Sequence, residues 1–399
     1  MKCRLLALIL ALILLCGCQE VLQDPSVKQS THTSVTIAPE FSDMEEPTVP
    51  APIYDPTPDF AETGITVDGR ELTVRYLADD VLMLRLQELA ELLQVTLTPA
   101  EQLEPGVYTC EIKGDDWNVS ISNNQTTFTI NGAKKEFPCK PRYDGSDWFA
   151  PAGTLLQALG YTEYADTEQD RLYYTMLPDV SKIPEGTEIP VMMYHAVSDN
   201  YWGEADLFVS PGELEKQLQY LLDNGYTPIW FEDLPNVADI EKPILLTFDD
   251  GYDDNYTELY PILQKYQVKA TIFVIAGDLA QHHKMTAEQV TELATSGLVS
   301  IQSHTMTHPD LNTVWGDELQ YQLGQSQLEL TRMTGKQPFV LCYPTGFYSD
   351  ESLEVTRQYY QFGLLMSSGR YTTGDDRYLI PRYYVSRYTG LDAFADMIS

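Results

Sequence analysis

Two aspartates stand directly behind a short apolar run, and their placement suggests chemistry. Asp249 and Asp250 follow residues 245–248, whose sequence is LLTF, and precede Gly251. Successive side chains of a strand point to opposite faces, so two carboxylates at its end can have different roles. One can be a metal ligand while the other takes a proton from a bound water, which is the division that metal-assisted hydrolysis requires.

Two histidines supply the other half of such a centre. His304 and His308 occur in the sequence SHTMTH, at positions i and i+4. On a helical turn or a folded loop this spacing aims two imidazoles at one point. Two imidazoles and one carboxylate leave coordination positions open for water and a substrate oxygen. The sequence therefore predicts a catalytic metal site, and the spacing alone leaves open which aspartate is the ligand.

The elements that must position these residues alternate between strands and helices over 189–399. Strands are expected at 189–194, 227–230, 243–248, 270–276, 299–303 and 339–343, and helices at 211–222, 257–266, 286–295, 317–333 and 350–360. Such alternation predicts a parallel sheet, and the length of this segment favours a (β/α) barrel. Sites in these folds lie at the carboxyl ends of strands. His195 and the Pro344-Thr345-Gly346 segment also follow expected strands there.

The motifs of this segment resemble those of the metal-dependent polysaccharide deacetylases. The resemblance covers about residues 189–395 and is carried by TFDDG at 247–251, SHTMTH at 303–308 and CYPTG at 342–346. It implies a distorted (β/α) barrel in which Asp249 is the general base. It further implies that Asp250, His304 and His308 bind a divalent metal, most often zinc. A backbone N–H near Thr345, beside Pro344, would hold the developing oxyanion.

Two positions depart from the family pattern. Cys342 occupies the place where an arginine usually contacts the base, and no histidine follows His308 to act as the late general acid. The opening Met-Tyr-His, which ends at His195, resembles one subset of the family in which an early histidine takes that role. We therefore expect His195 to protonate the leaving amine, with a core histidine at a strand end as the alternative. Arg382 is a candidate replacement for the missing arginine, or a structural ion-pair partner, and Cys342 itself is expected to be a packing residue.

The N-terminal segment predicts export and anchoring. Residues 1–17 combine a basic start with an apolar run too short for a membrane span, which is typical of a signal peptide. The sequence LCGC ending at Cys18 resembles a lipobox, which implies lipidation of that cysteine. Residues 18–60 are rich in proline and acidic side chains and are expected to form a disordered tether. The mature chain is therefore expected outside the cytoplasm, lipid-anchored to the cell membrane.

Residues 61–178 are expected to form a small α+β domain. A strand and turn, helical stretches at 82–93 and 148–161 and a hairpin around Asn123-Asn124 are recognisable, and residues 82–96 resemble residues 148–162 as a weak internal repeat. The pattern resembles the copper amine oxidase-like N-terminal domain, which implies a stalk or binding module. Copper chemistry is excluded because no histidine lies in this segment. A disulfide between Cys110 and Cys139 is possible in an oxidising compartment, and the sequence leaves it open.

The charge of the chain limits the classes of molecule that it is expected to bind. The chain has 399 residues and a formal net charge of −34, so nucleic acid is not an expected partner. The leading hypothesis is N-deacetylation of an extracytoplasmic N-acetylglucosamine polymer of peptidoglycan or poly-N-acetylglucosamine type. Alternatives are hydrolysis of O-acetyl esters, an inactive wall-binding lipoprotein, and an iron oxygenase triad. The oligomeric state and the polymer are not specified by the sequence.

Overall fold

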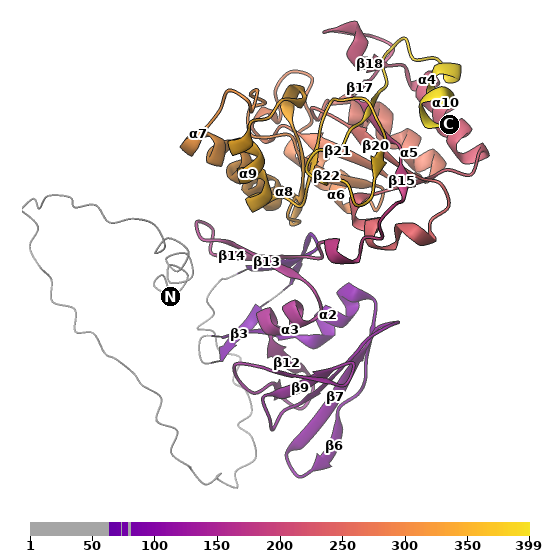
Figure 1. Ribbon diagram of the computed structural model, residues 1–399. Helices are drawn as coiled ribbons and strands as arrows, with labels where there is room; N and C mark the ends of the chain where they lie inside the picture. The colour runs from indigo at the N-terminus through magenta and orange to yellow at the C-terminus, as the bar shows by residue number, and fades with distance from the viewer. Residues whose placement is uncertain (1–63, 73, 79–80) are drawn as a thin grey trace, which may run out of the picture. The chain divides into compact units, whose positions relative to one another are not determined.

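The computed structural model describes residues 64–399 except 73 and 79–80 (Figure 1). For residues 74–78 it describes only the backbone. The expected signal peptide at 1–17, the lipidated Cys18 and the tether at 18–60 lie outside these residues. The described residues belong to one compact unit. Within them, every helix is too short or too polar to cross a lipid bilayer.

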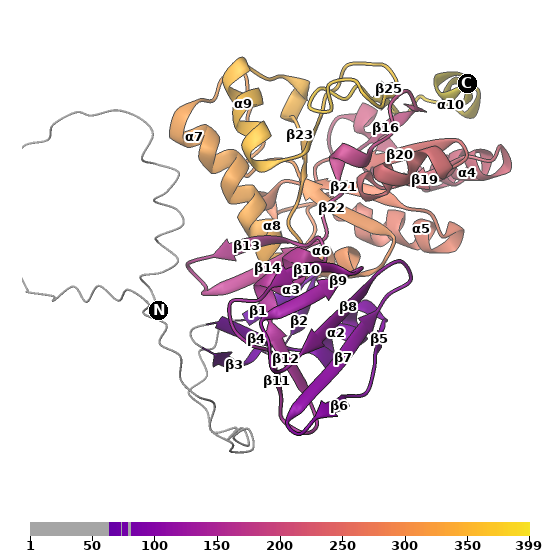
Figure 2. The same ribbon diagram turned by 60° about the horizontal axis from the view of Figure 1, so that its bottom comes forward.

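The first part of the described chain consists of three antiparallel or mixed sheets, which Figure 2 shows from below. Their orders are β13-β14-β1-β2, β10-β9-β8-β7-β5 with β6 beside β7, and β11-β12-β4-β3. The strands are β1 (Gly64–Val67), β2 (Arg70–Leu72), β3 (Val74–Ala78), β4 (Val81–Arg85), β5 (Thr96–Leu97), β6 (Glu101–Glu104), β7 (Val107–Lys113), β8 (Asn118–Ser122), β9 (Thr127–Ile130), β10 (Ala133–Glu136), β11 (Arg142–Tyr143), β12 (Trp148–Pro151), β13 (Thr162–Asp166) and β14 (Arg171–Thr175).

The internal repeat corresponds to a strand followed by a helix, present twice. Strand β4 leads into α2 (Leu86–Leu93), and β12 leads into α3 (Ala152–Ala158). The two strands pair antiparallel, with Ala150 opposite Leu84. The expectation that helical structure begins at Leu82 and at Trp148 is therefore wrong. Met83 and Leu84 are both fully buried on opposite faces of a strand, and an apolar run of that kind has no clear helical period.

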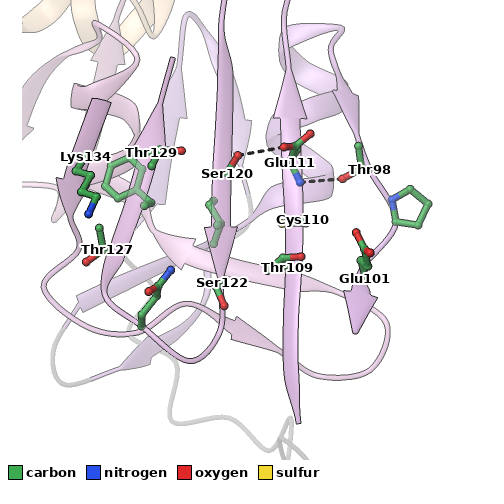
Figure 3. A pocket seen from close by; sticks show the side chains of 14 residues that line it. Thr98, Glu101, Thr109, Cys110, Glu111, Ser120, Ser122, Thr127, Thr129 and Lys134 are labelled. Atoms are coloured by element: carbon green, nitrogen blue, oxygen red, sulfur yellow. Dashed lines mark hydrogen bonds between the residues drawn. The ribbon is translucent and has the colours of Figure 1, made fainter. Parts of the chain in front are cut away.

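Cys110 and Cys139 are both buried and are not joined to each other, so the disulfide that the sequence left open is not formed. The Sγ of Cys139 lies 3.8 Å from the sulfur of Met83, and Cys110 packs in the hydrophobic core with Ile121 and Phe128. Cys110, Ile121 and Phe128 also border an open hollow of about 620 Å³, whose other lining residues include many hydroxyl groups, among them Thr109, Ser120 and Thr127 (Figure 3).

The second part of the chain is built on an eight-stranded sheet in which every pairing is parallel. Its order is β24-β23-β22-β21-β20-β16-β26, with β19 also beside β20. The strands are β16 (Val191–Tyr194), β19 (Thr227–Ile229), β20 (Pro243–Phe248), β21 (Ala270–Val274), β22 (Val299–Ser303), β23 (Val340–Cys342), β24 (Phe362–Leu364) and β26 (Tyr383–Tyr384). Two short pairs flank it, β15 (Glu188–Ile189) with β25 (Tyr371–Thr372) and β17 (Ala196–Val197) with β18 (Phe208–Val209).

All helices of this part except the last, α10, lie in the chain between strands, as expected for a parallel sheet. They are α4 (Pro211–Asp223), α5 (Tyr260–Tyr266), α6 (Ala287–Thr295), α7 (Gly316–Gln320), α8 (Ser326–Thr334), α9 (Asp350–Tyr359) and α10 (Leu391–Ile398). Ser210 caps α4 by accepting a hydrogen bond from the N–H of Glu213, which confirms the predicted start. Two helices predicted as continuous contain π-helical turns, η4 (Asn255–Leu259) before α5 and η6 (Tyr321–Gln325) between α7 and α8.

The parallel sheet predicted from sequence is confirmed, and its two ends are joined indirectly. Strands β24 and β26 are not direct neighbours, but a single parallel bridge links Leu364 to Ile380 just before β26. The N–H of Leu365 donates to the carbonyl of Ile380, and the N–H of Arg382 donates to Ser367. The segment that ends in Arg382 therefore runs along the open side of the sheet and brings this arginine inside.

Strand β20 at the middle of this sheet is buried on both faces. Ile244, Leu246 and Phe248 pack in one hydrophobic cluster, while Leu245 packs in another on the opposite face. Asp249 continues the alternate set that contains Leu245 and Thr247, and it is 2 % exposed. The strand therefore directs this carboxylate to the side that Arg382 occupies.

Candidate active site

The residues singled out in the sequence meet at one edge of the parallel sheet. His195 follows β16, Asp249 and Asp250 follow β20, and His304 follows β22. The sheet order places β16 beside β20 and β21 beside β22. Because all of these strands are parallel, their carboxyl ends lie together. The positions of these residues just after their strands therefore predict where the centre lies.

Asp250, His304 and His308 converge as the sequence predicted. The Asp250 Oδ1 lies 3.4 Å from Nε2 of His304 and 3.6 Å from Nε2 of His308. One ligand atom from each residue lies within 4.8 Å of the other two. The Nδ1 of His304 is 2.8 Å from the carbonyl oxygen of Cys342, so Nδ1 carries the proton and Nε2 is left as a lone-pair donor. The donor set fits a divalent metal ion.

A second triad of potential ligands shares His304 and adds Asp249 and Cys342. The guanidinium of Arg382 already contacts both of these side chains, at 2.8 Å from Oδ2 of Asp249 and 3.1 Å from Sγ of Cys342. A cation placed there would be repelled by a positive charge buried beside it. Of the two triads in the described chain, the one with Asp250 and His308 is therefore the better cation site.

The charges of the first triad are balanced in a way that suits a cation. Burial raises the pKa of Asp250, but the hydrogen bond with His304 and the nearby charge of Lys284 lower it by more, and the net direction is strongly down. Burial and the neighbouring His304 lower the pKa of His308 to about 4, which keeps this imidazole neutral. A neutral imidazole and a carboxylate are the protonation states that metal binding requires.

Three residues of this centre have a strained backbone. Asp250, Thr305 and His308 have φ angles of 76°, 67° and 57°, in the left-handed region that non-glycine residues rarely adopt. The hydroxyl of Thr305 accepts a hydrogen bond from the N–H of His308 at 3.0 Å. Such strain persists only where surrounding contacts impose it. The local fold therefore bends twice to aim Asp250 and His308 at one point.

Asp249 is held by a two-pronged ion pair with Arg382. Nη1 and Nη2 of Arg382 donate to Oδ1 and Oδ2 of Asp249, each at 2.8 Å, and both side chains are buried. Arg382 also donates to the carbonyl of Leu365 and the hydroxyl of Thr247. Burial raises the pKa of Asp249, but the charge and hydrogen bonds of Arg382 outweigh it and lower the pKa to about 2. Asp249 is thus a carboxylate throughout the neutral range.

His195 lies on the other side of the same carboxylate. Its Nε2 is 3.9 Å from Oδ2 of Asp249, and its buried Nδ1 has no hydrogen-bond partner within the described residues. The side-chain amide of Asn255 donates to its backbone carbonyl at 3.0 Å, and Tyr384 packs edge-on against its ring. Burial lowers the pKa of His195 and leaves the ring neutral.

Comparison with known proteins decides the family. Residues 236–361 match the family model described as polysaccharide deacetylase. YxkH of Bacillus subtilis, whose name assigns it to the polysaccharide deacetylases, is 34% identical over 227 residues, which cover 54% of this chain and 78% of that protein. The chain belongs to the polysaccharide deacetylase family. The family resemblance stated from TFDDG, SHTMTH and CYPTG is therefore confirmed, whereas the comparisons do not test the resemblance proposed for residues 61–178.

Other polysaccharide deacetylases match shorter stretches. The peptidoglycan-N-acetylmuramic acid deacetylase PdaA of Bacillus subtilis is 32% identical over 120 residues, which are 30% of this chain and 44% of PdaA. The poly-beta-1,6-N-acetyl-D-glucosamine N-deacetylase of Staphylococcus aureus is 26% identical over 172 residues, which are 40% of this chain and 58% of that protein. This chain therefore spans about half of each of these two relatives.

Solved structures support the same fold. The deacetylase PplD of Streptococcus pyogenes, solved in complex with acetate, has a TM-score of 0.50 and 27% identity, covering 54% of this chain and 99% of that chain. BC0361, a polysaccharide deacetylase from Bacillus cereus, has a TM-score of 0.51 and 22% identity, covering 76% of this chain and 99% of that chain. The second likeness concerns the fold alone.

The segment proposed for the oxyanion is placed after β23, as in the family motif. Pro344 to Gly346 form a 3₁₀ turn, η7 (Pro344–Gly346), in which Thr345 has a φ of 58°. The first amides of a helical turn have no partner within that turn. The Thr345 hydroxyl donates to the carbonyl of Pro344 at 2.6 Å. Among the described residues, no hydrogen bond or ion pair joins Thr345 to the metal triad or to Asp249, so its role stays a prediction.

Cys342 lies in the centre of this deacetylase site, although the sequence suggested only packing for it. Burial raises the pKa of its thiol, so the S–H is neutral and can donate to Oδ2 of Asp249, 3.4 Å away. Its sulfur also accepts from Arg382 at 3.1 Å. The resemblance places an arginine at this position in the family, and in this chain Arg382 instead contacts Asp249 through both of its terminal nitrogens.

Sequence reasoning missed Lys284 and left Tyr252 unassigned. Lys284 Nζ donates to the backbone carbonyl of Asp250 at 2.9 Å and lies 4.1 Å from the centre of the Tyr252 ring. Burial, together with the charge of Asp250, raises the pKa of Tyr252, which follows Asp250 by two positions. For Tyr252 the adjacency to the aspartates was a usable signal. For Lys284, which lies in a polar loop after β21, the sequence offered none.

Proposed function

We propose that this protein is a metal-dependent hydrolase that removes acetyl groups from N-acetylglucosamine units of an extracytoplasmic polysaccharide, of peptidoglycan or poly-N-acetylglucosamine type. One observation carries the proposal. Ligand atoms of Asp250, His304 and His308 meet within 4.8 Å of one another, and Asp249, which immediately precedes Asp250 in the chain, is held by Arg382. The relatives named for peptidoglycan and poly-N-acetylglucosamine deacetylation support the substrate class.

Asp250, His304 and His308 would hold a divalent ion, and zinc suits two imidazoles and one carboxylate. When bound, such an ion polarises the acetyl carbonyl and lowers the pKa of a coordinated water. The protein's own contribution begins with Asp249. Arg382 keeps it ionised and fixes both of its oxygens, so that it is oriented to accept a proton from the attacking water.

His195 then delivers a proton to the leaving amine. Its ring is neutral, so it first accepts at Nε2, 3.9 Å from Oδ2 of Asp249, the proton that Asp249 has taken from the water, and then releases that proton to the amine nitrogen as the C–N bond breaks. Catalytic hydrogen bonds are often longer in structures without substrate and tighten on binding. An N–H of the turn at Thr345, with Pro344 before it, faces the developing oxyanion in this scheme.

Acetate release tests the proposal. The purified protein is incubated with acetylated glycans, namely peptidoglycan and N-acetylglucosamine oligomers with β-1,4 or β-1,6 linkages, and with O-acetylated xylan, each with and without chelator. We expect release from at least one N-acetylated glycan that chelator abolishes. Asp249→Asn should be inactive, while Asp239→Asn, the same change at an exposed aspartate of η3 (Phe231–Asp239), should be as active as the parent.

Two other results would contradict the proposed N-deacetylation and favour a different function. Release from the O-acetyl ester alone would make the protein an esterase. Release from none of the substrates by a protein that binds metal would favour a wall-binding lipoprotein without activity.

Anchoring by lipid at Cys18 is a separate proposal. It is supported by the LCGC sequence at 15–18 alone. Labelling with a radioactive fatty acid should mark the parental protein in cells and should fail with Cys18→Ala, which should appear in the medium. Labelling of the Cys18→Ala protein would refute it.

A further inference from the structure

A tryptophan beside the active site is held rigidly and is nevertheless open to solvent. Trp202 lies in the loop between β17 and β18, which follows His195, and it is 40% exposed. One face of its indole stacks on His283 at 3.9 Å between ring centres and an interplanar angle of 1°. Phe208 and Tyr252 meet it at steep angles, with ring centres 5.0 and 4.9 Å away.

The loop that carries Trp202 is fixed from its other side as well. The guanidinium of Arg387 lies 4.8 Å from the ring centre of Tyr201, the residue before Trp202. The backbone N–H of Arg387 donates to the carbonyl of Asp206, and its side chain donates to the carbonyl of Asp199. A ring that is already fixed loses little conformational entropy when a ligand contacts it.

The aromatic group belongs to the same edge of the sheet as the catalytic residues. Trp202 follows β16, Tyr252 follows β20 and His283 follows β21, and these three strands are neighbours. Tyr252 connects the indole to the centre, because its hydroxyl interacts with the carboxylate of Asp250. One side chain therefore separates the exposed indole from a metal ligand.

The open part of an indole is chemically suited to a sugar ring. Pyranose rings present C–H groups on a face, and these carry a partial positive charge that matches the negative face of an aromatic ring. An indole that is stacked on His283, contacted by Phe208 and Tyr252 and still 40% exposed presents aromatic surface to a sugar at low entropic cost. Packing the loop does not require the exposed area, because three rings and Arg387 already hold it.

We propose that Trp202 is a sugar-stacking subsite, which binds a pyranose next to the unit whose acetamido group is hydrolysed. The proposal rests on the function proposed above and adds that this enzyme prefers chains to single sugars. Stacking of this kind contributes equally before and during the reaction, so its loss should raise KM and leave kcat nearly unchanged.

Binding provides a test that does not depend on turnover. Tetramers of N-acetylglucosamine with β-1,4 and with β-1,6 linkages are titrated into the full chain by calorimetry in the presence of chelator. We expect Trp202→Ala to weaken binding of at least one tetramer about tenfold, within the range of aromatic stacking energies. Trp202→Phe should retain most of the affinity. Tyr321→Ala, which removes a 45% exposed ring from η6, should bind like the parent.

The outcomes separate this proposal from the function on which it rests. Equal affinity of the parent and Trp202→Ala for both tetramers, or no binding by the parent, would overturn the subsite. Trp202-dependent binding by a protein that releases no acetate would leave the subsite standing and remove the enzymatic function.

Kinetics with metal present then distinguish stacking from loop placement. For a tetramer that is deacetylated, Trp202→Ala should raise KM about tenfold with kcat within about twofold of the parent. An equal fall of kcat on the tetramer and on a small acetyl ester would show that Trp202 only positions the loop after His195.

Discussion

Replacing Arg382 by methionine should destabilise the protein and alter how its stability depends on pH. The arginine is 0% exposed and forms both of its 2.8 Å hydrogen bonds with a carboxylate that is 2% exposed. Methionine fills much of the volume of the arginine side chain but leaves the negative charge of Asp249 buried without a positively charged partner. Breaking a buried pair in this way costs about 3–5 kcal/mol of the free energy of unfolding.

The pKa of Asp249 gives the sign of the pH effect. In the parent it falls from its ordinary value of 3.8 to about 2, which corresponds to about 2 kcal/mol of stability at ~1.36 kcal/mol per pH unit. That stability is complete above the ordinary pKa and is lost as the pH falls toward about 2. Without Arg382, burial dominates and raises the pKa above its ordinary value. Asp249 then destabilises the folded state at neutral pH and is relieved by protonation on acidification.

Urea unfolding of the parent and Arg382→Met at several pH values between 4 and 7 measures both effects. We expect the difference in unfolding free energy to be largest at pH 7 and to shrink toward pH 4. The acid limb of kcat/KM should also move to higher pH, because the base is protonated sooner. Arg382→Lys keeps the charge but not the two-pronged geometry, so its unfolding free energy and its acid limb should lie between those of the parent and of Arg382→Met. A constant difference across this range, or an unchanged acid limb, would refute the account of Arg382 as the partner that keeps Asp249 ionised.

Three further substitutions test other parts of the site. His308→Ala should weaken metal affinity by about 100-fold or more in a metal titration, while its folding, followed by circular dichroism, stays intact; parental affinity would exclude His308 as a ligand. His195→Ala should lower kcat by about 100-fold or more at unchanged metal content, and a parental rate would remove its role as acid. Gly346→Ala should lower the melting temperature, because a Cβ there would lie 2.7 Å from the backbone nitrogen of Met366 at a φ of 74°; an unchanged melting temperature would show that the turn can relax.

The strand-end pattern predicted much of the site because it depends on local information. An apolar run followed by Asp249 and Asp250 identifies a strand and its carboxyl end, and the parallel sheet then brings such ends together. The spacing of His304 and His308 is equally local. Their convergence with Asp250 therefore followed from topology.

The rest depended on contacts between distant segments. Arg382 reaches Asp249 only because the segment after β24 bridges back along the sheet, and two- and three-residue strands such as β24 and β26 have too few residues to show a period. The contacts of Cys342 could not be predicted for a related reason, because Asp249 follows β20 and Arg382 precedes β26, both far from Cys342 in the chain. In β4, consecutive buried residues on both faces removed the alternation that would have distinguished a strand from a helix.

The left-handed backbone at Asp250, Thr305 and His308 affects how this enzyme would lose activity as the temperature rises. Each such conformation is disfavoured by about 1–2 kcal/mol in an ordinary chain, so the loops that carry the ligands sit closest to local opening while the buried strands beneath them remain intact. Activity should therefore disappear a few degrees before the sheet melts. Selection for higher thermal stability at these positions would relax the strained loops and would disturb the arrangement of the residues that hold the ion.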